Sequence, residues 1–213
     1  DAKKVCEFLL SGIEVVQYDV KQIKQENGLW YVGDYSAQNL VLATGYESDL
    51  ADLRYMGIRG TWGTRGDFSS KLPLDISMHQ SMSIGANIDG IIKLGATHEK
   101  EVKEVVLCKK EQALSLKEKA TTLIDTSDLE LKEVFCGMRA GSKDYFPLVG
   151  KVIDVPFMLD TYPAVTRGAK PVMKFVDNLF VCNCLGGRGF VFAPLMANML
   201  AECIVEGKEV VVR

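Results

Sequence analysis

Apolar and polar residues along the first 32 positions form one helical block and then several short blocks. Residues 2–10 have the spacing of an amphipathic helix, which stops at Ser11-Gly12. The blocks that follow have the length and composition of strands, with a turn at the glycine that separates the last two. The predicted strands are residues 13–18, 20–23 and 29–32, and the turn is at Gly28.

Residues 39–43 form a continuous apolar run that ends at Thr44-Gly45. Such a run predicts a strand buried on both faces. In an open α/β sheet, ligands bind beyond the carboxyl ends of the strands. Gly45 is therefore a candidate ligand contact.

The middle of the chain predicts a crossing segment and a hairpin. Residues 57–66 are rich in glycine and are predicted to carry the chain into a second region. Residues 83–87 and 91–96 flank Asp89-Gly90, which is a strong hairpin signal.

Two further helices are predicted before the C-terminal region. Residues 99–120 form a charged segment in which Glu99 and Lys103 would pair one turn apart. Residues 125–131 predict a second, shorter helix with Thr126 or Ser127 as its cap.

The C-terminal region predicts a strand, a glycine turn and a helix. Residues 178–184 form an apolar strand, and residues 194–206 form a mostly buried helix with Pro194 at its first position. Between them lies the glycine turn, residues 184–190. A turn before a helix N-terminus directs N–H donors at one point, which suits an anionic or electron-rich ligand atom. The alternative is a tight connection without a ligand.

Composition excludes several classes of protein. Of 213 residues, 47% are hydrophobic and 25% are charged, which is ordinary for a globular protein. The net charge of −3 gives no footprint for nucleic acid, so a tRNA partner would need a local patch or another domain. No apolar run approaches a membrane span, and no signal peptide is visible. Six cysteines without paired spacing and only two histidines predict no metal site, and free cysteines in a reducing cytoplasm.

Arg139 is the strongest candidate for binding a small acidic ligand. Its planar guanidinium matches a carboxylate with two parallel hydrogen bonds. The alternative is a surface arginine paired with a nearby acid such as Asp144. His98 could serve as a general base or be structural, and no catalytic residue is assigned. No G-x-G-x-x-G motif occurs, so the pyrophosphate-binding turn of a dinucleotide fold is absent from the sequence.

Three segments together resemble the D-amino acid oxidase superfamily of FAD-dependent amine oxidases. They are Val41-Leu42-Ala43-Thr44-Gly45, Gly137-Met138-Arg139 continuing to Pro147-Leu148-Val149-Gly150, and Gly186-Gly187-Arg188-Gly189 continuing to Ala193-Pro194. Within that superfamily, residues 139–147 and the Gly95-Ala96-Thr97 strand are most similar to one branch. That branch is the C-terminal oxidoreductase domain of the bifunctional enzymes that make 5-methylaminomethyl-2-thiouridine in tRNA.

The resemblance implies an α/β to α+β fold. The chain would be the distal part of an FAD-binding doubly wound domain plus an antiparallel-sheet substrate domain, without the N-terminal dinucleotide-binding segment. Residues 1–56 would be the remnant of the FAD-binding domain, residues 57–135 the substrate domain, and residues 136–213 the return to the FAD-binding domain. Lys143 departs from the family, which has arginine before the aspartate, and residues 151–175 match no motif.

The resemblance also implies roles for individual residues. Substrate contacts would be Arg139, Lys143 and Tyr145. Contacts to FAD would be Gly45, Arg59, Gly60, Gly186, Gly187, Arg188 and Gly189. FAD is expected in the full-length protein and not in this fragment.

The implied reaction is oxidative removal of the carboxymethyl group from carboxymethylaminomethyl-uridine in tRNA. The alternatives are an FAD-dependent amine or D-amino acid/glycine oxidase, and a partial domain without catalysis as isolated. The expected partner is tRNA or a small amine, with no membrane, in the cytoplasm. A truncated sheet would expose an edge and apolar faces, which predicts self-association.

Overall fold

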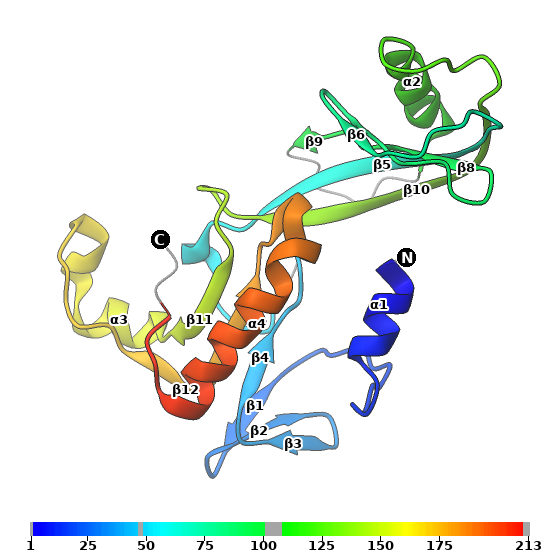
Figure 1. The fold of residues 1–213 in the computed structure, drawn as a ribbon. Helices are drawn as coiled ribbons and strands as arrows, with labels where there is room; N and C mark the ends of the chain where they lie inside the picture. Colours follow the sequence, from blue (N-terminus) through cyan, green and yellow to red (C-terminus); the bar gives the residue numbers. More distant parts are fainter. Residues whose placement is uncertain (1, 47–48, 101–107, 211–213) are drawn as a thin grey trace. The chain divides into compact units, whose positions relative to one another are not determined.

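The computed structural model describes residues 2–46, 49–100 and 108–210. The chain forms two compact units, residues 1–40 and residues 41–213, and each is described by itself (Figure 1). The division into three parts proposed from the sequence stays a prediction.

The first unit contains one helix and a small antiparallel sheet of three strands. Its elements are α1 (Ala2–Leu9), β1 (Lys24–Glu26), β2 (Leu29–Val32) and β3 (Tyr35–Ala37), and the strand order is β1-β2-β3. The helix, the turn at Gly28 and the strand at residues 29–32 are confirmed. Asn27 and Gly28 both have positive φ, 52° and 80°, as a two-residue hairpin turn with both central residues left-handed requires.

The strands predicted at residues 13–18 and 20–23 are wrong. These residues form no regular strand, and Ile13 and Val15 remain 61% and 66% exposed. A strand needs a neighbour to accept its hydrogen bonds, and no described strand pairs with this segment. An apolar pattern alone therefore misled the prediction.

The second unit is built on two long antiparallel strands, β5 (Arg59–Ser69) and β10 (Glu130–Gly141). They lie in a six-stranded sheet of order β10-β5-β8-β7-β6, and β9 also pairs with β5. The shorter strands are β6 (Met78–His79), β7 (Ser83–Ile84), β8 (Ile91–Gly95) and β9 (Glu99–Lys100). The glycine-rich segment predicted as a crossing is thus the first part of a long strand.

The predicted hairpin is confirmed. Ile84 of β7 lies opposite Leu94 of β8, and Ile88 bridges to Ile91. The turn residues Asp89 and Gly90 have positive φ, 53° and 79°.

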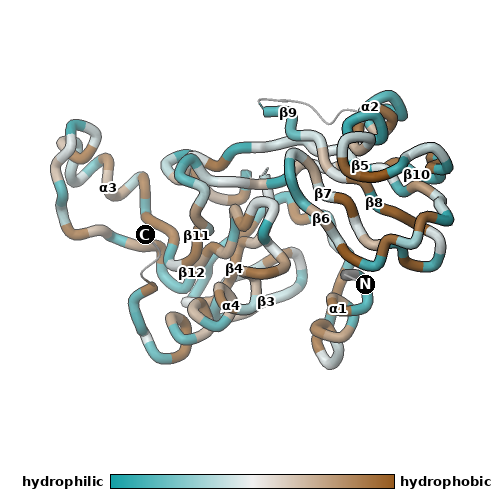
Figure 2. Tube along the Cα trace, turned by 45° about the horizontal axis from the view of Figure 1, so that its top comes forward, coloured by the Kyte–Doolittle hydropathy of each residue, from teal (hydrophilic) through white to brown (hydrophobic). Residues whose placement is uncertain are grey.

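Helix α2 (Lys110–Ala120) covers one face of this sheet (Figure 1). Leu116 on the helix packs in one core with Phe68 of β5 and Ile92 of β8, and each is at most 1% exposed. Figure 2 shows the hydrophobic colour along β8 where it faces this core. Because side chains alternate along a strand, the residues of β5 between the buried ones point to the opposite face. That face carries the site described below.

Both helices predicted in the middle of the chain need correction. Glu99–Lys100 is a strand, helix α2 begins only at Lys110, and the predicted partner Lys103 lies outside the described residues. Residues 125–129 form no helix and contain one turn at residues 127 and 128, and residues 130 and 131 already belong to β10. The carboxylate of Asp125 accepts from the Ser127 amide at 2.9 Å, a local bond that competes with helix formation.

A second, three-stranded sheet has the order β11-β12-β4. Its strands are β4 (Leu40–Leu42), β11 (Leu148–Ile153) and β12 (Phe175–Asn183), and short helical segments connect the remaining parts. These segments are η1 (Arg54–Met56), α3 (Val155–Thr161), η2 (Pro163–Arg167) and η3 (Gly186–Arg188). The strand predicted at residues 39–43 is confirmed, but not its burial on both faces. Leu42 is 3% exposed and Val41 is 38% exposed, because β4 lies at the end of the strand order.

Helix α4 (Gly189–Glu206) packs against this sheet through Leu200 and Cys203, which contact Phe180 of β12. It begins five residues before Pro194, which therefore lies inside the helix and not at its first position. Proline lacks the N–H that would bond to the carbonyl four residues earlier, so it leaves that carbonyl free. Gly207 ends the helix with a φ of 68°, as predicted.

Two expectations about α4 are wrong. The helix is only partly buried, since Leu195 and Val205 are 55% and 81% exposed. The stretch Gly186–Glu206 is also long and apolar enough to cross a membrane by length and composition, with 17% of its apolar window buried. Those two criteria are weak evidence, because core helices of water-soluble proteins meet them as well.

The expectation that all cysteines are free is also wrong. Cys108 and Cys136 are joined by a disulfide, whereas Cys6, Cys182, Cys184 and Cys203 are free. The two joined residues lie 28 positions apart in the sequence, and Cys136 belongs to β10. The cysteine pattern therefore no longer supports a reducing compartment, and a cytoplasmic location stays a prediction.

Candidate functional site

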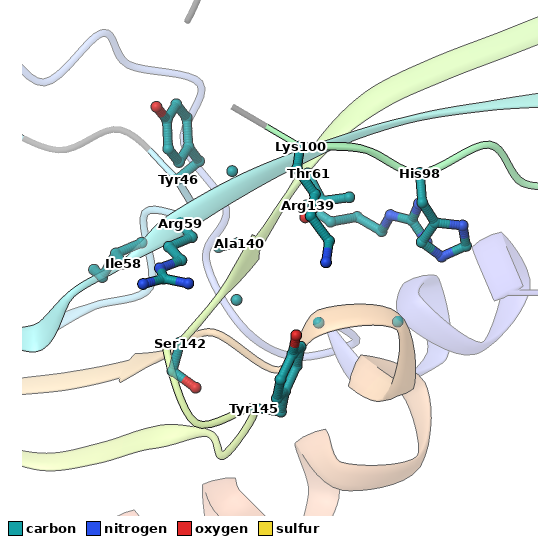
Figure 3. Close-up of a pocket in the computed structure, with 14 residues that line it drawn as sticks. Tyr46, Ile58, Arg59, Thr61, His98, Lys100, Arg139, Ala140, Ser142 and Tyr145 are labelled. Atoms are coloured by element: carbon teal, nitrogen blue, oxygen red, sulfur yellow. The ribbon is translucent and has the colours of Figure 1, made fainter. Parts of the chain in front are cut away.

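A pocket of about 670 Å³ opens on the face of β5 and β10 near the glycine turn (Figure 3). Its walls come from the first part of β5, the end of β10 with the loop after it, the segment before and within β9, and the glycine turn. The lining residues are Tyr46, Ile58, Arg59, Gly60, Thr61, His98, Lys100, Arg139, Ala140, Gly141, Ser142, Tyr145, Gly186 and Gly187.

Arg139 is the central polar group of this pocket. It lies on β10 opposite Thr61 of β5, and its Nη2 donates to the carbonyl of Thr97 at 3.0 Å. Partial burial lowers the pKa of its guanidinium. Among the described residues, no carboxylate forms an ion pair with Arg139. The remaining N–H donors are therefore available to an anionic ligand.

The proposed pairing of Arg139 with Asp144 is wrong. The carboxylate of Asp144 lies 2.9 Å from the Ser142 hydroxyl and accepts from the Phe146 amide at 3.2 Å. The hydrogen bond from Ser142 is the main cause that lowers the pKa of Asp144. Asp144 thus closes the loop that presents Tyr145, whose side chain is 73% exposed and whose φ is 65°.

Gly63 allows Arg139 to lie flat across β5. A Cβ at Gly63 would sit 2.4 Å from Nη2 of Arg139 and 3.0 Å from the carbonyl oxygen of Thr97. The first distance is shorter than real Cβ contacts, the second is tighter than most of them, and the carbonyl is backbone, which moves aside less easily than a side chain. Gly63 is therefore part of the site, although it does not line the pocket.

Replacing Gly63 with alanine is expected to weaken carboxylate binding about tenfold, because the methyl group displaces the guanidinium and breaks its bond to Thr97. Gly137 provides the matched control. It lies opposite Gly63 in the same strand pair, and a Cβ there meets nothing within 4 Å. Calorimetric titration of the FAD-loaded protein with a carboxylate ligand would measure both variants. Equal affinities for Gly63→Ala and Gly137→Ala would contradict the assignment.

The glycine turn places backbone donors on the wall next to Arg139. Gly186 has a φ of 59° with open space around its Cβ position, and the Cβ position of Gly187 is 3.8 Å from Nη1 of Arg139. The first N–H groups of a helix have no partner within it, so those of this turn can face a ligand.

Asn183 connects this turn to the end of β4. Its side chain is 4% exposed, donates from Nδ2 to the Gly45 carbonyl at 2.8 Å, and accepts from the Cys184 amide at 2.7 Å. Gly45 and Cys184 both have positive φ, 76° and 59°. One buried amide therefore holds two bends of the backbone together.

The pocket brings together six of the residues predicted from the sequence: Arg59, Gly60, Arg139, Tyr145, Gly186 and Gly187. The others, Gly45, Lys143, Arg188 and Gly189, do not line it. Gly45 directly precedes the lining residue Tyr46, and the guanidinium of Arg188 lies 4.8 Å from the ring centre of Phe192. Their roles stay predictions.

Gly60 has a packing role that the sequence did not reveal. A Cβ there would lie 2.6 Å from the sulfur of Met138 and 2.8 Å from the ring of Tyr46. Glycine is thus required by neighbouring side chains, whether or not a cofactor approaches.

Sequence reasoning missed Thr61, Gly63, Lys100 and Asn183. Lys100 and Thr61 belong to this site only because β9 and β10 flank β5 in a particular register. No pattern in the sequence indicates that register. The position of Asn183 at the end of a buried strand, next to the glycine turn, was the one usable signal.

Comparison with known proteins places this geometry in a family. The family model described as FAD dependent oxidoreductase, DAO, matches residues 6–203. A curated relative is the tRNA 5-methylaminomethyl-2-thiouridine biosynthesis bifunctional protein MnmC of Legionella pneumophila (strain Lens). The two sequences are 24% identical over an alignment of 215 positions. The alignment covers 96% of this chain and 31% of that protein.

Solved structures agree at the level of the fold. Glycine oxidase from Bacillus cereus ATCC 14579 matches with a TM-score of 0.68 and 19% identity, over 90% of this chain and 50% of that one. Iminodiacetate oxidase from Chelativorans sp. BNC1 matches with a TM-score of 0.60 and 17% identity, over 90% and 50%. The chain thus spans about half the length of these structures and under a third of the curated relative. Sheets covered by helices, shared with these oxidases, confirm the α/β character of the fold, and the chain belongs to the FAD dependent oxidoreductase family.

Proposed function

We propose that the protein containing this chain removes a carboxymethyl group from a secondary amine by oxidation, and that its substrate is carboxymethylaminomethyl-uridine in tRNA. The observation that carries the proposal is the guanidinium of Arg139, which faces the pocket and has no carboxylate partner among the described residues. The paired N–H donors of a guanidinium, which form a planar fork, suit the carboxylate of an N-carboxymethyl amine. The likeness to the MnmC protein supports the choice of tRNA.

The residues present fit a flavin ring near the glycine turn. The Cβ positions of Gly186 and Gly187 have no close neighbour except Nη1 of Arg139, so the backbone there is open to a flat ligand. FAD, when bound, accepts a hydride from the carbon next to the amine nitrogen. The amides of the glycine turn would stabilise negative charge on the ring through the positive end of α4.

The chain's own residues would bind and orient the substrate. Arg139 would hold the carboxylate, and its bond to the Thr97 carbonyl fixes the direction of the fork. With the carboxylate anchored, the adjacent carbon has little freedom, which is the main help that a binding site gives to such a reaction. Hydrolysis of the oxidised substrate by water would release glyoxylate and leave an aminomethyl group on the uridine.

A small amine or amino acid oxidase is the second candidate. The structural likeness to glycine oxidase and to iminodiacetate oxidase favours it, because those proteins share the fold of the site-bearing unit. The same pocket and the same role for Arg139 would serve either substrate class.

The test uses the protein expressed with whatever sequence flanks these residues, loaded with FAD. It is incubated with tRNA that carries carboxymethylaminomethyl-uridine, and the nucleosides are then analysed by mass spectrometry. The expected result is conversion to the aminomethyl nucleoside together with glyoxylate. Turnover of glycine, sarcosine or D-alanine, with the tRNA left unchanged, would favour the second candidate and overturn the first.

The 213-residue chain alone serves as the control. It is expected to purify without the flavin absorbance at about 450 nm and to convert neither substrate, because the pyrophosphate-binding turn is absent from the sequence. A yellow preparation with stoichiometric FAD would contradict this part of the proposal.

A further inference from the structure

The pocket is lined by positively charged groups without an acidic residue among them. Arg59, Lys100 and Arg139 are all lining residues, and His98 lies beside them. Among the fourteen lining residues that the structure describes, none is aspartate or glutamate. The charge of the site is therefore left for a ligand to balance.

Two of these cations stand in one row across three strands. Thr61 of β5 lies opposite Arg139 of β10 on one side and opposite Lys100 of β9 on the other. Residues directly opposite each other in antiparallel strands point to the same face. With strands about 4.8 Å apart, the Cα atoms of Arg139 and Lys100 are separated by roughly 10 Å.

Figure 3 shows how the side chains are grouped. Those of His98, Lys100 and Arg139 gather on one side of the pocket, while Arg59 lies apart, beside Ile58. Lys100 and His98 are exposed and form the outer part of this group, and Arg139 forms its inner part.

The described acids near this group have other partners. Glu99 precedes Lys100 on the same strand but points to the opposite face, where its carboxylate accepts from Nε2 of Gln112 on α2. Asp67 accepts from Arg65, and Asp144 is bonded within its own loop. Within the described ranges, no ion pair includes Lys100.

We propose that Lys100 binds a second anionic group of the substrate, while Arg139 binds the carboxylate next to the reacting carbon. The substrate class is then an amine with two acidic groups. This inference rests on the proposed function, since it takes Arg139 as the carboxylate anchor. A lysine ammonium is a compact charge on a flexible stem, so it suits either a second carboxylate or a phosphate.

The primary test compares two ligands that differ by one carboxylate. Sarcosine and iminodiacetate both carry an N-carboxymethyl amine, and iminodiacetate adds a second acid. Binding to the FAD-loaded protein is measured by calorimetry without oxygen, so the readout does not depend on turnover. Iminodiacetate is expected to bind about fivefold more tightly than sarcosine at low salt, as befits an exposed ion pair, and the preference should fall as salt rises.

Variants assign this preference to Lys100. Lys100→Gln should remove this preference, because it weakens iminodiacetate about fivefold more than it weakens sarcosine. Lys93→Gln is the matched control, because Lys93 is exposed on β8 and does not line the pocket. If Lys100→Gln weakens both ligands equally, the second subsite is refuted. If sarcosine itself does not bind to the unmodified protein, it is the proposed function that fails.

A second pair of probes identifies the source of the second anion. The free nucleoside carboxymethylaminomethyl-uridine has no phosphate, whereas a trinucleotide with this residue at its centre has two. If a polynucleotide phosphate occupies the subsite, Lys100→Gln weakens the trinucleotide about fivefold and spares the nucleoside. If Lys100→Gln weakens iminodiacetate but not the trinucleotide, the second anion is the carboxylate of a small amine. An unchanged affinity for all of these ligands would overturn the inference.

Discussion

Replacing Arg139 with glutamine is expected to weaken the binding of an N-carboxymethyl amine by about 100-fold. The loss corresponds to about 3 kcal/mol, the upper range for a hydrogen bond to a charged group. Glutamine keeps a polar side chain but is shorter, and it loses the charge and the paired N–H donors of the guanidinium. Because Arg139 has no described carboxylate partner, its removal leaves no other charge uncompensated. The measured change would therefore report on the ligand and not on a disrupted ion pair.

Two comparisons sharpen this prediction. Arg139→Lys restores the charge but cannot bond to the Thr97 carbonyl and to both carboxylate oxygens in the same way, so an intermediate affinity is expected. Arg167→Gln removes one charge from an exposed position in η2 outside the pocket and should change nothing. Calorimetry with sarcosine measures all three variants. Normal binding by Arg139→Gln would remove the basis of the proposed function.

Leu116→Ala is expected to destabilise the second unit by about 2–5 kcal/mol, the usual cost of deleting a buried leucine side chain. Leu116 is 1% exposed and packs from α2 into the core formed with β5 and β8. Its loss leaves a cavity between the helix and the sheet, on the face opposite the pocket. Urea unfolding followed by circular dichroism would measure the change.

The same helix supplies the control for this second prediction. Leu114 lies two positions away and is 45% exposed, so Leu114→Ala should cost no more than about 0.5 kcal/mol. Both variants change helix propensity by the same small amount, and the difference between them reports on burial alone. Similar unfolding midpoints for the two variants would show that α2 does not pack as described.

The parts of the fold that the sequence predicted well are those set by local chemistry. The turns at Gly28 and Asp89-Gly90 require left-handed backbone, and Gly207 ends a helix for the same reason. Such residues act within a few positions of themselves, so their effect can be predicted without knowing the fold.

The wrong predictions of secondary structure share a different cause. Residues 13–18 have the composition of a strand but no partner, and residues 125–131 have helical spacing but are used to start β10. The first segment lacks a strand to pair with, and the second pairs with a distant strand, so contacts between distant parts of the sequence outweighed local preference in both cases. Pro194 was placed at the start of a helix because that is its usual position, yet α4 begins earlier on the glycine turn.

The candidate site divides in the same way. Arg139 and the glycine turn were found because arginine and consecutive glycines have distinctive chemistry. Lys100 was not predicted, because lysines are common on surfaces and only the strand register places this lysine opposite Thr61. The role of Gly63 was not predicted for a related reason. It leaves room for the side chain of Arg139, which lies 76 positions later in the sequence.

Asn183 gives the site a chemical dependence on a single group. The carboxamide donates to the Gly45 carbonyl and accepts from the Cys184 amide at the same time, which an ionised carboxylate cannot do. A carboxylate of the same size would set two oxygens against each other at Gly45. The separation between the end of β4 and the glycine turn, and with it the room for a flat ring, thus depends on the Nδ2 atom of Asn183.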